Sequence, residues 1–161
     1  MKITAMLPLL MLLAMAALAQ STPDSHAHDV DSRGDKAMGF EHTKTTHHFL
    51  LNRNGGVIRV EANDPNDESS RASVRMHLAH IAHAFSQGDF QIPMLVHDQT
   101  PPGAEAMKRM KDSIRYQYAE IANGGEVVIS SRDPKALAAI HEFLRFQIRE
   151  HRTGDSPKSS D

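Results

Sequence analysis

Two stretches of the chain match each other 69 residues apart, and this repeat limits how the chain can fold more than any other feature. Asn54-Gly55-Gly56 leads through a β-branched run to Asp64-Pro65, and Asn123-Gly124-Gly125 leads in the same way to Asp133-Pro134. Each Asp-Pro step opens a helical pattern of apolar residues. Both patterns stop at the same dipeptide: Gly88-Asp89 and Gly154-Asp155. The agreement at turn, helix start and helix end indicates an internal duplication.

Each copy has a readable local structure. A Gly-Gly step between two alternating runs predicts a hairpin turn, because glycine adopts positive φ angles freely. Asp64 and Asp133 are predicted helix caps, each followed by proline at the first helical position. We therefore predict an α+β fold built on a duplicated β-β-α unit (about 45–89 and 113–155). Four antiparallel strands would form one sheet with two long helices on one face, and the intervening insertion would hold a short helix from Ala104.

The two ends of the chain differ from this domain in composition. Residues 1–19 have a positive start, an apolar run and small residues before Gln20, which predicts a signal peptide cleaved between Ala19 and Gln20. Export to the periplasm or beyond follows, with no membrane span after cleavage; an uncleaved anchor is the alternative. The polar stretch 20–38 is predicted to be a disordered leader and 153–161 a flexible tail. A single domain spans 39–152.

Cysteine and charge exclude several classes of protein. The chain has no cysteine, so disulfide-stapled scaffolds, thiolate metal sites and thiol catalysis are ruled out. Its formal net charge of −2 gives no reason to expect a nucleic-acid partner. We also find no phosphate-binding loop, nucleophile elbow or zinc-protease motif, and we predict no catalytic role.

The most unusual residue type is histidine, of which the chain has 11. On the first predicted long helix the buried stripe is Val74, Leu78, Ile81 and Phe85, with His77 at its edge and His80 turned toward solvent. Imidazole binds copper, zinc and nickel. We therefore expect a late transition metal site without catalysis, its ligands drawn from five histidines: His47, His48, His77, His80 and His97. A thioether from Met94, Met107 or Met110 would favour copper(I).

Other interpretations of these residues remain open. The histidines of the first helix could form only a polar surface, and the pair His26 and His28 could bind metal weakly at most. His141 falls inside an apolar stripe and is predicted to be buried and bonded to a sheet carbonyl. Eleven histidines could instead give a response to pH, or one could serve as a general base. The main alternative is an interaction module for an envelope protein, to which Phe143 and Phe146 would add apolar surface.

Several motifs also carry a resemblance to other proteins. They are Thr45-Thr46-His47-His48-Phe49, Ala62-Asn63-Asp64-Pro65 and the run from His141-Glu142-Phe143-Leu144 through Thr153-Gly154-Asp155. Together they resemble a group of small exported bacterial proteins without an assigned activity. The resemblance implies export, and it transfers no functional residue to this chain.

Overall fold

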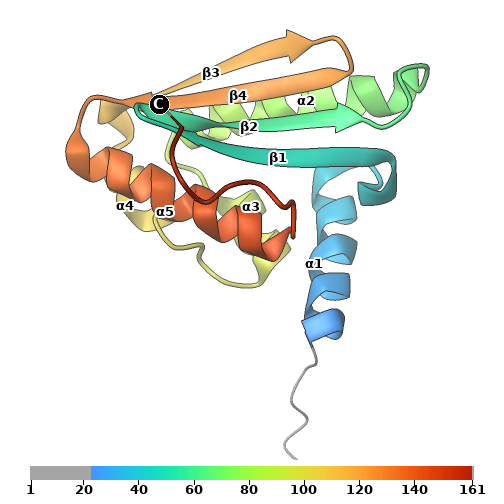
Figure 1. Cartoon of the computed structure of the whole chain (residues 1–161), viewed down its shortest axis with the longest axis horizontal. Helices are drawn as coiled ribbons and strands as arrows, with labels where there is room; N and C mark the ends of the chain where they lie inside the picture. Colours follow the sequence, from blue (N-terminus) through green and yellow to red (C-terminus); the bar gives the residue numbers. More distant parts are fainter. Residues whose placement is uncertain (1–22, 161) are drawn as a thin grey trace, which may run out of the picture.

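The computed structural model describes residues 23–160, with side chains from Asp29 onward. The predicted signal peptide lies outside the described residues. His26 and His28 precede Asp29, so their side chains are also outside the described part of the chain. Figure 1 shows a twisted sheet with helices packed beneath it and the N-terminal helix extending from one end. None of the helices within residues 23–160 has the length and apolar character needed to cross a membrane.

Residues 23–160 form one four-stranded antiparallel sheet and five α-helices, which confirms the predicted α+β class. The strands lie in the order β1-β2-β4-β3, so the two hairpins meet along β2 and β4. The order β-β-α occurs twice along the chain, while an origin by duplication stays a prediction. The elements are α1 (Pro23–Met38), β1 (Thr45–Asn52), β2 (Gly55–Ala62), α2 (Glu68–Ser86), α3 (Gln91–His97), α4 (Ala104–Arg109), β3 (Ile114–Ile121), β4 (Gly124–Ser131) and α5 (Pro134–Glu150).

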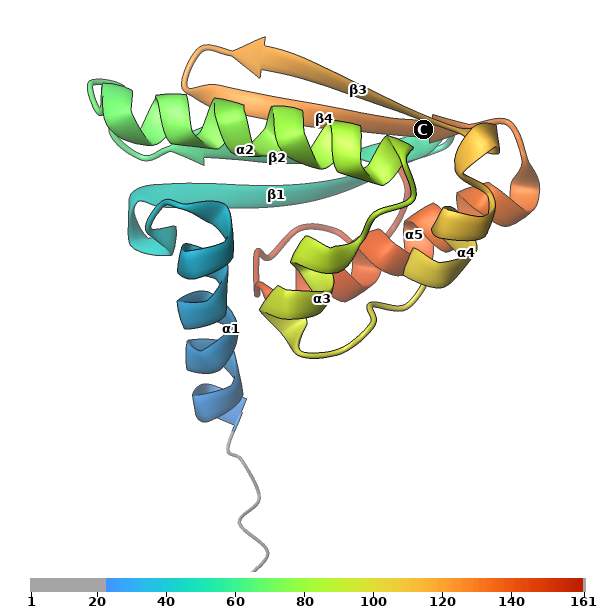
Figure 2. The ribbon, with the colours of Figure 1, turned by 180° about the vertical axis from the view of Figure 1, so that it is seen from behind.

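Both long helices cover the same face of the sheet, as predicted (Figure 2). Gly56 on β2 faces Leu144 of α5, and Gly125 on β4 faces Leu78 of α2. Gly56 pairs with Ile129, which lies on the same face of β4 as Gly125. Each helix thus packs mainly on its own half of the sheet, leaving room between them for the core and a cavity.

The Gly-Gly steps are not the hairpin turns, and this expectation was wrong. Asn52 pairs with Gly55 in the ladder, so the turn consists of the two residues between them, and both glycines belong to β2. A Cβ on Gly56 would lie 2.3 Å from the Leu144 side chain and 2.4 Å from the Leu50 carbonyl oxygen. Glycine is required here by close packing of a helix and a neighbouring strand rather than by a turn.

The helix ends agree with prediction in part. Asp133 caps α5 by accepting bonds from the backbone of Lys135 and Ala136, with Pro134 in the first turn. The cap of α2 is Asp67 and not Asp64, since its carboxylate accepts a bond from the Ser70 N–H. Gly88 follows α2 with the positive φ of 78° that suits a helix terminus.

The described parts of both terminal segments, 23–38 and 153–160, contact the rest of the domain, where composition predicted disorder. Residues 23–38 form α1, which packs on α3: Val30 is fully buried, and the Arg33 side chain donates to the Val96 carbonyl at 2.8 Å. The tail lies along the outer edge of β1, where Ser160 donates from its backbone to the Leu51 carbonyl at 3.0 Å. Composition did not predict these two contacts, because each segment is held by only a few apolar groups and by hydrogen bonds to distant parts of the chain.

Candidate functional site

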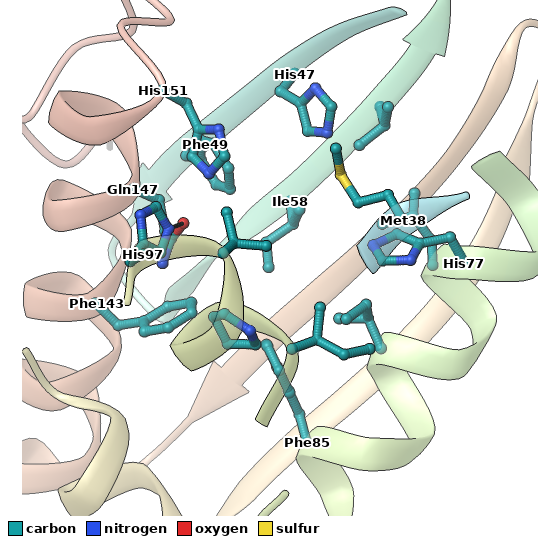
Figure 3. A pocket seen from close by; sticks show the side chains of 16 residues that line it. Met38, His47, Phe49, Ile58, His77, Phe85, His97, Phe143, Gln147 and His151 are labelled. Atoms are coloured by element: carbon teal, nitrogen blue, oxygen red, sulfur yellow. Dashed lines mark hydrogen bonds between the residues drawn. The ribbon is translucent and has the colours of Figure 1, made fainter. Parts of the chain in front are cut away.

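A half-open cavity of about 60 Å³ lies between the sheet, α2, α3 and the end of α5 (Figure 3). That volume suits an ion or a few water molecules. Of the described residues, 16 line it, and none of these 16 is Asp, Glu, Lys or Arg. Most are apolar core side chains such as Phe49, Ile58 and Leu78. The polar members are four histidines and one glutamine, a set we call the histidine pocket: His47, His77, His97, His151 and Gln147.

The first two histidines come from different elements and meet around one aromatic ring. His47 projects from β1 onto the helix-covered face of the sheet, and His77 projects from α2. The Phe40 ring stacks on His47 with centroids 6.1 Å apart and meets His77 edge-on at 5.6 Å. Figure 3 shows the Met38 side chain between the two imidazoles. Met38 is the last residue of α1, so the unexpected helix brings a thioether into this site.

The other two histidines form the opposite wall. His151 follows α5, and its ring lies parallel to that of His47, with centroids 5.8 Å apart and an angle of 8° between planes. His97, at the end of α3, meets His151 edge-on at 5.0 Å. The buried His97 also bonds through Nε2 to the Gln147 side-chain oxygen at 2.9 Å. Gln147 therefore orients His97, and its own Nε2 has no hydrogen-bond partner among the described residues.

Three imidazoles of this pocket, those of His47, His77 and His151, resist protonation. Burial is the main cause that lowers the pKa of His47 to about 4, and the neighbouring His77 and His48 lower it further. Burial, assisted by His80, lowers the pKa of His77 to about 4. For His151, burial comes first and then His47 and His97, and together they lower its pKa to about 3. At neutral pH all three rings are uncharged and keep a nitrogen lone pair free of a proton.

The structure brings together three of the five histidines predicted as ligands. His47, His77 and His97 line the pocket, but His48 and His80 do not. Alternation along β1 turns His48 to the other face, where its Nδ1 lies 2.9 Å from Asp155 Oδ1. His80 lies on the exposed surface of α2. Sequence spacing could place residues on a helix or strand, but it could not show which surfaces would meet.

His151 is the pocket histidine that sequence reasoning missed. It stood alone in the sequence, after the last apolar residue of α5, and only the return of that helix across the sheet brings it beside His47. Met38 was missed because residues 20–38 were predicted to be disordered. The three methionines that were predicted as thioether ligands are absent from the lining of this pocket: Met94, Met107 and Met110.

His141 bonds to the backbone of the sheet as predicted, although it is half-buried rather than buried. Its Nε2 lies 2.9 Å from the Asn52 carbonyl oxygen and 3.0 Å from that of Gly55. The half-buried ring thus bonds to the backbone of the first hairpin and joins α5 to the sheet. The predicted partner surface at Phe143 and Phe146 is wrong, because Phe143 is 1% and Phe146 4% exposed.

The histidine pocket brings few metal-binding side chains together at any one position. Within the described part of the chain, no three His, Cys, Asp or Glu side chains lie close enough together to hold a metal ion. What the pocket does provide is pairs of neutral imidazoles beside a thioether. No family model, curated protein sequence or solved structure matches this chain. Function must therefore be argued from the chemistry of the site.

Proposed function

We propose that this is an exported, non-catalytic binding protein that holds a late transition metal ion in the histidine pocket. The observation that carries the proposal is the placement of His47 and His77. They come from two elements, contact the same Phe40 ring and line one half-open cavity. Neutral imidazole is a good ligand for copper, zinc and nickel.

The protonation state of the pocket supports this function. A histidine of ordinary pKa is partly protonated near neutral pH, so a metal must compete with protons for it. Burial removes most of that competition at His47 and His77, whose pKa values are lowered to about 4. The parallel ring of His151 restricts the orientation of His47 from the other side. The site is therefore prepared to bind a cation without first losing protons.

The roles of the remaining predicted ligands change accordingly. His97 is held by Gln147 and supports His151 through an edge-on ring contact, so we place it in the wall behind the ligands. His48 and His80 take no part in the proposed site. Storage, buffering or handover of the ion would each need only reversible binding, which the half-open cavity allows.

Metal binding to the untagged, signal-free protein tests this function. Equilibrium dialysis against copper, zinc or nickel, followed by elemental analysis, should give one tightly bound ion per chain. His47→Ala and His77→Ala should each lower the affinity at least tenfold. His83→Ala is the matched control, since His83 lies exposed on the same helix as His77. Absence of a stoichiometric ion, or equal affinity in all four proteins, would refute the proposal.

A second candidate is the envelope interaction module, and one observation favours it. The outer face of the sheet carries a row of apolar side chains across three strands, since Leu50 pairs with Val57 and Val57 with Val128. Leu50 is 37% exposed there. Val57 and Val128 beside it are half-buried, and contiguous apolar surface of this kind can be extended by a partner into a contact surface. A photoreactive residue at position 50 should then cross-link one envelope protein that the same group at position 83 does not reach.

A further inference from the structure

The thioether of Met38 reaches the same cavity as the two proposed ligands. Met38 is half-buried, packs against the core and lines the pocket beside His47 and His77. Helix α1 holds it there through the buried Val30 and the bond from Arg33 to α3. A further anchor is His42, whose backbone and ring both bond to the Asp35 carboxylate on α1. These three contacts hold α1 in place, and with it the backbone of Met38 beside the pocket.

The charge of the lining limits which ion can enter. A cation in this pocket meets neutral nitrogen, sulfur and hydrocarbon, since none of the 16 lining residues carries a carboxylate or a basic group. The cost of removing an ion from water rises with the square of its charge, and a buried charge without a counter-charge is costly. A monovalent ion is therefore admitted at much lower cost than a divalent one.

The kind and number of ligands point the same way. Thioether sulfur is a soft ligand that selects copper(I), and imidazole binds copper in either oxidation state. Structural zinc sites use four ligands in a tetrahedron. His47, His77 and Met38 supply two nitrogens and one sulfur, a set that satisfies copper(I).

We propose that the bound ion is copper(I), and that the Met38 thioether binds it together with His47 and His77. This inference rests on the proposed metal-binding function of the same pocket. It assigns α1 a role, namely to complete the site with the one soft ligand among the 16 described lining residues. Binding involves no oxidation or reduction of the ion.

The test is an anaerobic titration with copper(I) against a chromophoric copper(I) chelator, together with copper X-ray absorption spectroscopy. Wild-type protein should withdraw one equivalent and show one sulfur neighbour. Met38→Leu should weaken copper(I) binding at least tenfold, lose the sulfur neighbour and leave zinc affinity unchanged within about twofold. Met94→Leu is the matched control, because Met94 is exposed on α3 outside the pocket.

The outcomes separate the two proposals. If wild-type protein binds copper(I) without a sulfur neighbour, or if Met38→Leu binds it as tightly as wild type, the assignment of Met38 is overturned while metal binding stands. If wild type binds zinc or nickel but not copper(I), the choice of ion is overturned. If it binds none of these ions, the proposed function fails as well. Should Met38→Leu not fold, the absorption spectrum of wild type decides alone.

Discussion

The rings of His47 and His151 lie parallel, 5.8 Å apart between centroids, although 104 positions separate them in the chain. One belongs to β1 and the other follows α5, so their contact links the first strand to the last helix. Burial lowers the pKa of both rings, and His47 lowers that of His151 further. Protonation of this cluster should therefore act on the fold as a whole.

The first prediction concerns pH. The pKa values of His47, His77 and His151 lie below the ordinary 6.5 in the folded protein, so the unfolded chain binds more protons. The metal-free protein should keep its full stability above about pH 6.5 and lose stability as pH falls toward about 4. Thermal melts between pH 7.5 and 4.5 measure this. His151→Phe should make the melting temperature depend less on pH, whereas His83→Ala should leave its pH dependence unchanged. A wild-type melting temperature that stays constant between pH 7.5 and 4.5 would contradict the prediction.

A second prediction tests the close approach at Gly56. In Gly56→Ala the new methyl group would meet the Leu144 side chain and the Leu50 carbonyl oxygen, and the carbonyl cannot move without disturbing the ladder. We expect a loss of about 1–3 kcal/mol in the free energy of unfolding, measured by urea denaturation. Ser130→Ala in β4, on the outer face of the sheet, is the control and should change stability by less than about 0.5 kcal/mol. Equal midpoints for both variants would contradict the packing argument.

A third prediction concerns the C-terminal tail. The Asp155 carboxylate accepts bonds from the Phe49 N–H and from the His48 ring, both at 2.9 Å. Burial acts to raise the pKa of Asp155, but the hydrogen bonds from Thr153, Phe49 and His48 outweigh it and leave that pKa below its usual value. Asp155→Ala should release the tail from β1.

The measurement for the tail is hydrogen exchange at the amides of β1. In Asp155→Ala the Phe49 amide should exchange at least tenfold faster, while amides of α2 keep their wild-type rates. Asp112→Ala serves as control, because the Asp112 side chain is 93% exposed. Unchanged exchange at Phe49 would show that the contact does not hold the tail in place.

The fourth prediction tests the core. Phe143 is 1% exposed and meets Phe85 and Phe90 edge-on, at 5.8 and 5.9 Å between centroids. Phe143→Ala should lower the free energy of unfolding by about 3–5 kcal/mol, since it removes a large buried side chain and leaves a cavity. Leu95→Ala on α3 should have little effect, because Leu95 is 65% exposed. Chemical denaturation of both variants compares them directly, and a similar loss in each would be inconsistent with a core role.

Local patterns predicted much of the fold. The buried stripe of α2 contains the four residues expected from helical periodicity: Val74, Leu78, Ile81 and Phe85. Asp133 and Pro134 start α5, and α4 begins at Ala104 as predicted. These features depend on a few neighbouring residues, so their causes are present in the sequence itself. The Gly-Gly steps led to a wrong prediction because glycine is common both in turns and where other elements approach the backbone closely. Only the tertiary structure, in which α5 and β4 pack against Gly56 and Gly55, shows that the second use applies here.

The candidate site was less accessible to sequence reasoning. His47, His77 and His97 could be named from clustering, yet the same reasoning also selected His48 and His80, which lie elsewhere. Alternation along a strand places adjacent His47 and His48 on opposite faces, but the sequence did not show which face would be covered. Met38 and His151 had no local signal, since each reaches the pocket through the packing of its helix.

By itself the sequence determined the α+β class, the antiparallel sheet, the central stripe of α2 and the absence of thiol chemistry. Each follows from residue type and periodicity along a short stretch of chain. The tertiary structure decided the order of strands, the docking of α1, and the meeting of His47, His77 and His151 in one cavity. Those contacts join segments far apart in the chain, and they form because burying apolar surface brings specific faces together, which no local pattern encodes.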